Sequence, residues 1–254
     1  MKLTTREITI AGILGAITII LGFTYFGYIT LPTPAGAATL MHIPVIISGI
    51  VLGARIGALV GTIFGLSAIY YFLSIAPIWV LFPARPLIGV FAALSFQFFY
   101  KFLGKEKSKR YIFLKHIFLS IIIFEIFFHT FLLVFSNNMF LQIYNKYNIP
   151  ISIIISIILS FSIILSFVIA ILFFNFLIKK DPHISSMIFA SIIGSMTNTV
   201  ITLGLAVIFK IFNFQQALSV GILQGIPEAI VAVLICVPIS IFLRRYIGAT
   251  QKPT

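Results

Sequence analysis

Long apolar runs follow one another along the whole chain, separated by short breaks of polar residues, glycine or proline. A helix of about 20 apolar residues is long enough to cross the hydrocarbon core of a bilayer. By that criterion the pattern predicts eight transmembrane helices, at residues 8–28, 40–54, 56–75, 85–103, 117–136, 151–178, 185–209 and 216–243. The predicted fold class is an all-α integral membrane protein, with residues 1–254 in a single membrane domain.

The composition also indicates a chain that is surrounded by lipid. Hydrophobic residues make up 61% of the sequence and charged residues only 9%, whereas soluble domains carry about 25% charged residues. So few charges do not cover the surface of a soluble globule of this size. The net charge of +12 would suggest nucleic acid in a soluble protein, but basic residues also gather on the cytoplasmic loops of membrane proteins. We therefore expect the bilayer, and no nucleic acid, as partner.

The distribution of basic residues predicts the orientation of the chain. An even number of spans places both termini on the same side of the membrane. If that side is the cytoplasm, all but three of the 17 lysines and arginines lie inside, including those of the loop at residues 104–110. The three exceptions are Arg85, Lys146 and Lys210. The positive-inside rule thus predicts a multi-pass protein of the cell membrane with cytoplasmic termini.

Small residues at helical spacing mark faces where helices approach closely. Gly57, Gly61 and Gly65 fall on one face of the third predicted helix, because residues four apart are neighbours on a helix. Glycine lets membrane helices come near each other, so we expect this face to pack inside the protein.

The first predicted helix carries two pairs of small residues of the same kind. Ala11 and Gly15 are four apart, and so are Gly12 and Ala16. This flat face either packs internally or receives a partner protein.

Arg85 combines a fixed charge with a helix start. It precedes Pro86, which suits the first turn of a helix, and it is the only arginine expected at the outer end of the protein. The positive end of a helix dipole adds to the guanidinium charge, so this position is suited to bind an anion.

Other polar side chains fall within the predicted spans, where they are costly unless they have partners. Pro227 lacks a backbone donor and is expected to break the last helix beside Glu228, which requires a cavity or buried partners. The polar residues expected to converge in the outer half of the bundle are Arg85, His42, Asn198, Gln224 and Glu228. For any single residue, two interpretations remain: a structural role in an internal Arg–Glu pair with hydrogen-bonded amides, or a role in binding a ligand. The set as a whole favours a ligand site.

Motifs of catalysis are missing from the sequence. It contains no HExxH, no GxSxG, no phosphate-binding loop and no cluster of His and Cys, so we predict no enzyme, no cofactor and no metal. Glu125 and His129, four apart in the fifth predicted helix, form either a neutralised structural pair or a proton relay. The alternative function of another class is an ion-coupled secondary transporter, with Glu125, His129 and Glu228 as proton carriers.

Four segments carry a resemblance to a known family. Residues 41–66, 82–89, 194–200 and 225–230 resemble, in the same order, helices of the substrate-binding S components of prokaryotic energy-coupling factor (ECF) transporters. The resemblance covers residues 8–103 and 185–243, and it is most similar to the pantothenate branch, with the riboflavin and folate branches nearby.

This resemblance implies a six-helix bundle, with four core helices in residues 8–103, the last two in 185–246, and an inserted helix pair in 105–182. It further implies high-affinity binding of a water-soluble vitamin from outside, and assembly with a transmembrane coupling protein and two cytoplasmic ATPases. ATP hydrolysis by these partners would topple the S component and release the vitamin inside. The small residues implied to meet the coupling protein are Ala11, Gly12, Gly15 and Ala16, and the loop at residues 31–40 would close over the pocket.

Overall fold

The computed structural model describes residues 4–30, 37–72, 76–103 and 181–248. The chain forms two compact units, and almost all described residues belong to the unit made of residues 1–101 and 182–254. The predicted spans at 117–136 and 151–178, with Glu125 and His129, lie outside the described residues. The count of eight spans therefore stays a prediction.

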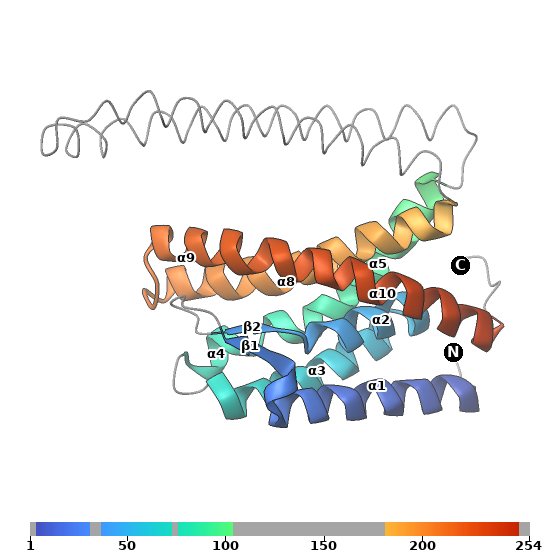
Figure 1. Ribbon diagram of the computed structural model, residues 1–254, viewed down its shortest axis with the longest axis horizontal. Helices are drawn as coiled ribbons and strands as arrows, with labels where there is room; N and C mark the ends of the chain where they lie inside the picture. Colours follow the sequence, from blue (N-terminus) through green and yellow to red (C-terminus); the bar gives the residue numbers. More distant parts are fainter. Residues whose placement is uncertain (1–3, 31–36, 73–75, 104–180, 249–254) are drawn as a thin grey trace, which may run out of the picture. The chain divides into compact units, whose positions relative to one another are not determined.

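Helices dominate the described unit (Figure 1). They are α1 (Thr5–Phe23), α2 (His42–Leu52), α3 (Ala54–Phe72), α4 (Ile78–Leu81), α5 (Ala84–Leu103), α8 (Pro182–Ile208), α9 (Phe214–Val220) and α10 (Ile226–Ile247). Four helical stretches are long and apolar enough to cross a membrane, namely Thr5–Phe23, Ile78–Leu103, Pro182–Ile208 and Phe214–Ile247, while His42–Leu52 and Ala54–Ile69 are shorter and apolar. The six predicted helices of the core are thus all present, within a few residues of their predicted bounds.

Helix α1 ends earlier than predicted, and a small hairpin follows it. Thr4 caps the helix, because its hydroxyl accepts from the Glu7 amide and the Glu7 carboxylate accepts from the Thr4 amide at 2.7 Å. After Phe23 the chain forms a 3₁₀ turn (Tyr25–Gly27) and strand β1 (Tyr28–Thr30), which pairs antiparallel with β2 (Ala37–Thr39). The all-α prediction missed this hairpin, because its two strands are only three residues long each and hydropathy alone does not mark them.

Helices α2, α3 and α5 meet at glycines. A Cβ on Gly49 or Gly57 would overlap the backbone of Gly89, and a Cβ on Gly61 would overlap the carbonyl of Arg85. On Gly65 it would lie 2.7 Å from the ring of Phe82. The predicted internal packing of the α3 glycine face is therefore confirmed, and it brings α5 against α3 backbone to backbone.

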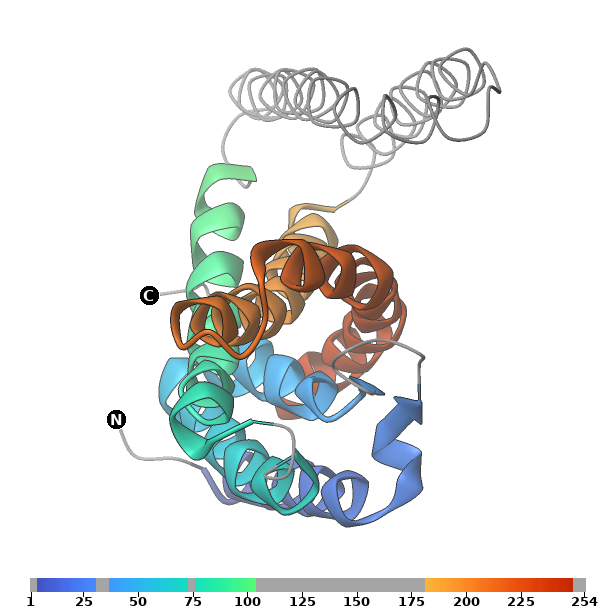
Figure 2. The ribbon, with the colours of Figure 1, turned by 90° about the vertical axis from the view of Figure 1, so that its left-hand side faces the viewer.

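The helices alternate in direction, so the unit has two distinct ends. Figure 1 shows that α1 begins and α10 ends at the same end, while the hairpin, α4 and the α8–α9 turn gather at the other. At the first end the Arg244 guanidinium donates to the Ile50 carbonyl at 2.8 Å and lies 4.5 Å from the centroid of the Phe96 ring. These contacts join α10, α2 and α5, and Figure 2 shows the same helices viewed end on.

Candidate functional site

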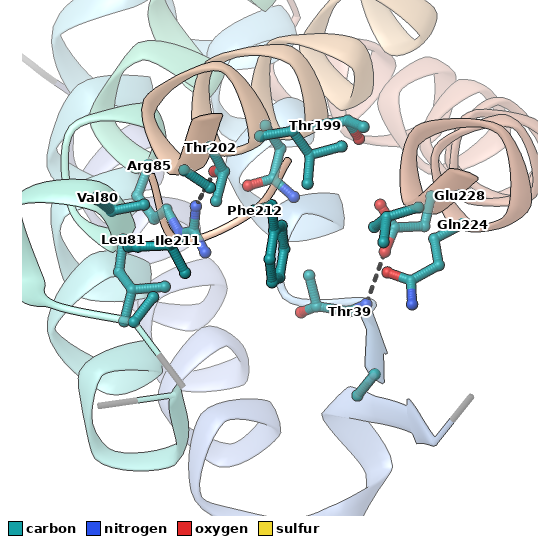
Figure 3. Close-up of a pocket in the computed structure, with 16 residues that line it drawn as sticks. Thr39, Val80, Leu81, Arg85, Thr199, Thr202, Ile211, Phe212, Gln224 and Glu228 are labelled. Carbon is teal, nitrogen blue, oxygen red and sulfur yellow. Dashed lines mark hydrogen bonds between the residues drawn. The ribbon is translucent and has the colours of Figure 1, made fainter. Parts of the chain in front are cut away.

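A pocket with an empty volume of about 680 Å³, including its open part, lies within this unit. Its walls come from β2, α4, the first turn of α5, α8, the α8–α9 turn and the region where α9 passes into α10 (Figure 3). Pockets that bind small organic molecules are mostly apolar and carry a few well-placed polar groups. The mixed lining of this pocket is suited to such a molecule.

Four of the five polar residues predicted to converge line this pocket: Arg85, Asn198, Gln224 and Glu228. The fifth, His42, is fully buried at the start of α2 and does not line it. Its Nε2 lies 3.4 Å from the Ser195 hydroxyl, so His42 packs between α2 and α8. The prediction that these residues converge at one end is correct for four, and His42 lies apart from the pocket.

Arg85 forms the cationic end of the pocket. It is the second residue of α5 and only 3% of its surface is exposed. Its guanidinium donates to the Thr202 hydroxyl and lies 5.1 Å from the centroid of the Phe64 ring. The Arg85 Nε has no hydrogen-bond partner among the described residues. A buried guanidinium with a donor to spare, at a helix N-terminus, is ready to accept an anionic group.

The glycine face of α3 positions Arg85. Since Gly61 lacks a Cβ, the first turn of α5 lies directly on it at the carbonyl of Arg85 and the Cα of Pro86. A larger residue at Gly61 would push this turn, and with it the guanidinium, away from α3.

Glu228 and Gln224 form an acidic and amide-bearing end. Gln224 belongs to a π-helical turn (Gly221–Gly225) that joins α9 to α10, and Glu228 follows in the first turn of α10. This turn is the form taken by the helix break that was predicted at Pro227. Because the two residues are four apart, both face the pocket, where they are 5% and 7% exposed.

Glu228 binds the hairpin and makes no ion pair with Arg85. Its Oε1 accepts from the backbone amide of Thr39 at 2.8 Å, which ties α10 to β2 (Figure 3). Among the described residues, Arg85 and Glu228 form no salt bridge with each other. The direct Arg–Glu salt bridge considered from the sequence is therefore not formed, and both side chains line the pocket.

Asn198 adds a further polar group that lacks a partner. It lies on α8, is 6% exposed, and its Oδ1 finds no hydrogen-bond partner in the part of the chain that the structure describes. Buried polar groups are nearly always hydrogen-bonded in folded proteins. An unsatisfied amide oxygen that lines a pocket therefore points to a ligand that donates to it.

Among the lining residues that the sequence analysis missed are Thr39, Thr202 and Phe212. Thr202 follows Asn198 by four residues on α8, and that spacing is a signal that was available in the sequence. Thr39 contributes its backbone amide, which any residue type supplies. Phe212 is one of 28 phenylalanines, and its place in a turn between two apolar helices carries no signal.

The small residues of α1 divide into two sets. Gly12 and Ala16 are exposed, and a Cβ on Gly12 would have no described atom within 4 Å. Gly15 is buried, with Ile63 of α3 at 3.1 Å from its would-be Cβ, and Ala11 is half-buried. The face of α1 that is open to a partner is therefore the one with Gly12 and Ala16.

A comparison with protein-family models identifies the chain. Residues 6–177 match the model described as "ECF transporter, substrate-specific component". This range includes α1 and Arg85 and ends before α8. No match is found among curated proteins.

The match decides between the functions that the sequence left open. Substrate-specific components of ECF transporters are transport subunits and not enzymes, and they work with the other subunits of an ECF transporter. The ion-coupled secondary transporter is therefore not the function supported. Because the family model covers about two thirds of its residues, the chain belongs to the family of substrate-specific components of ECF transporters.

Proposed function

We propose that this substrate-specific component binds pantothenate for uptake into the cell. The observation that carries this proposal is a buried arginine with a free donor, Arg85, in the same pocket as an unsatisfied amide and a carboxylate that does not pair with it. Pantothenate has a carboxylate at one end, two hydroxyl groups at the other, and an amide between them. Its groups thus complement the polar groups of the pocket in kind and in number.

Each polar residue has a role in this proposal. Arg85 holds the carboxylate through parallel hydrogen bonds, a geometry that a guanidinium supplies. Asn198 and Gln224 serve the amide and a hydroxyl, because a side-chain amide offers both a donor and an acceptor. Glu228, whose Oε1 already accepts from the Thr39 amide, accepts a hydrogen bond from a ligand hydroxyl on its second oxygen.

The chemistry of the pocket sets pantothenate above the riboflavin and folate alternatives. Riboflavin carries no carboxylate and would leave the buried charge of Arg85 uncompensated. Folate carries two carboxylates on the same glutamate end, and Arg85 is the one basic residue among the described residues that line the pocket, so the second carboxylate would be buried without a cationic partner.

Calorimetry with the purified chain tests the substrate. We expect pantothenate to bind. Its neutral alcohol analogue, panthenol, should bind more weakly by a factor of about ten or more, because it lacks the carboxylate that Arg85 holds. Binding of riboflavin or folate in place of pantothenate would discard the substrate and keep the family. Equal affinities for pantothenate and panthenol would show that the pocket does not recognise the carboxylate charge.

The orientation proposed is that the pocket opens to the outside and both termini lie in the cytoplasm. Arg6, Arg55, Lys101, Arg244 and Arg245 lie toward the helix ends opposite the pocket, which supports this orientation under the positive-inside rule. The same binding experiment tests it in vesicles: right-side-out vesicles are expected to bind labelled pantothenate, and sealed inside-out vesicles are not.

The proposed domain organisation is a single membrane domain in which residues 105–182 form an inserted helix pair. Support comes from the end of α5 and the start of α8, which lie together: the Tyr100 and His183 rings are 4.2 Å apart between centroids. A segment that leaves and re-enters the unit at the same end crosses the membrane an even number of times, if it crosses at all.

The exposed face of α1 is proposed to meet the coupling protein of the ECF transporter, which works with two cytoplasmic ATPases. Replacing Gly12 by leucine should block close helix approach at this face, since its Cβ position is free of described neighbours. We expect pantothenate binding to be retained and ATP-dependent uptake by the assembled transporter to fall about tenfold or more. A matched control is Gly204→Leu, which changes another exposed glycine on α8. Loss of binding together with uptake would mean that Gly12 packs internally.

A further inference from the structure

Phe212 lies between the two polar ends of the pocket. Figure 3 shows its ring standing between Arg85 with Thr202 on one side and Gln224 with Glu228 on the other, above Thr39. All of these residues line the same pocket. A ligand that reaches both polar ends therefore has to pass beside this ring.

The turn that carries Phe212 is held firmly. Lys210 has a positive φ of 59°, which reverses the chain after α8, and the amides of Ile211 and Phe212 both donate to the Ala206 carbonyl, at 2.8 and 3.2 Å. Directly after Phe212, Asn213 caps α9 by accepting from the Gln216 amide at 2.8 Å. With hydrogen bonds on both sides of it, the Phe212 backbone holds a defined place, and its side chain lines the pocket.

The general character of the pocket does not by itself select a ligand. A mainly apolar lining with a few polar groups is common to the binding sites of many small molecules. The aromatic ring between the polar ends adds a requirement of shape, because the stretch of ligand between those ends contacts the apolar side chain of Phe212. A short aliphatic stretch satisfies that surface, whereas a bulky group at the same point collides with it.

We propose that Phe212 determines specificity by dividing the pocket, so that it selects narrow two-ended ligands with an anionic group at Arg85, hydrogen-bond donors at Glu228, and a short unbranched aliphatic stretch against the ring. This inference rests on the proposed function of the pocket. Phe212 thus selects the middle of the ligand and contacts neither of its two ends.

A pair of ligands and a pair of variants test this role. The ligands are pantothenate and an analogue that carries a phenyl group on the two-carbon chain between its amide and its carboxylate. The variants are Phe212→Ala, which opens the division, and Phe214→Ala, a matched control in the same connection whose side chain is 65% exposed and does not line the pocket. Affinities are measured by calorimetry on purified, monodisperse protein.

Wild type and Phe214→Ala are expected to prefer pantothenate by about tenfold or more. In Phe212→Ala, pantothenate is expected to bind about tenfold more weakly, while the phenyl analogue gains affinity, so that the preference reverses. The Phe212→Leu variant keeps apolar bulk, supports folding if the alanine variant is unstable, and should show an intermediate preference.

The outcomes separate this inference from the proposed function. If wild type binds neither ligand, the pantothenate assignment fails, and the specificity role of Phe212, which rests on it, is overturned with it. If wild type binds pantothenate but Phe212→Ala and Phe212→Leu keep the wild-type ratio of the two affinities, the specificity role of Phe212 is overturned and the proposed function stands.

Discussion

Replacing Arg85 by lysine should weaken pantothenate binding by about 2 kcal/mol, a loss of about 30-fold in affinity. Lysine keeps the positive charge but does not reproduce the planar pair of parallel donors that fits a carboxylate. The shorter reach of its head group also removes the contact of the guanidinium with Thr202. Calorimetry on the purified variant measures the loss directly.

Two comparisons make this result specific to the carboxylate. Panthenol lacks the carboxylate, so its affinity should differ little between wild type and Arg85→Lys. Lys210→Gln serves as the control variant, because Lys210 is an exposed basic residue at the same end of the unit that does not line the pocket. An unchanged affinity for pantothenate in Arg85→Lys would remove Arg85 from the binding site.

Replacing Gly89 by alanine should destabilise the protein by about 3 kcal/mol. The added methyl group would overlap the backbone of Gly57, and backbone atoms cannot turn aside as the end of a flexible side chain does. The helices α3 and α5 would have to separate, which would also shift the start of α5 and with it Arg85. Thermal unfolding of the purified protein in detergent measures the effect.

Gly204→Ala is the matched control for this prediction. It makes the same change in helix α8, where the new Cβ would have no described atom within 4 Å. Alanine is favoured over glycine in a helix by about 0.5–1 kcal/mol, so this variant should be as stable as wild type or slightly more stable. Equal unfolding temperatures for Gly89→Ala and Gly204→Ala would contradict the tight crossing of α3 and α5.

Much of the candidate site could be predicted from the sequence, because polar and charged side chains are costly inside a membrane span. Arg85, Asn198, Gln224 and Glu228 stood out as polar residues in apolar runs, and the structure brings all four to one pocket. His42 stood out for the same reason and yet lies beside Ser195, away from that pocket. Position along a helix predicts depth, but the direction of a side chain depends on how its helix is rotated against its neighbours.

Packing faces were partly predictable in the same way. The spacing of Gly57, Gly61 and Gly65 indicated an internal face, because residues four positions apart lie on the same side of any α-helix. The two small-residue pairs of α1 were equivalent in the sequence. Only the position of α3, where Ile63 meets Gly15 and leaves Gly12 free, distinguished the internal pair from the exposed one.

The sequence by itself determined that this chain is a membrane protein, where its core helices lie and which polar residues are exceptional. Hydropathy, charge and residue spacing are local properties, so they can be evaluated without knowledge of the fold. Tertiary structure decided the rest. The β1–β2 hairpin, the bond from the Thr39 amide to Glu228 and the place of the Phe212 ring all join residues that are distant along the chain or that look ordinary in it. Such contacts depend on how the helices are arranged in three dimensions, and no local pattern of residue types encodes that arrangement.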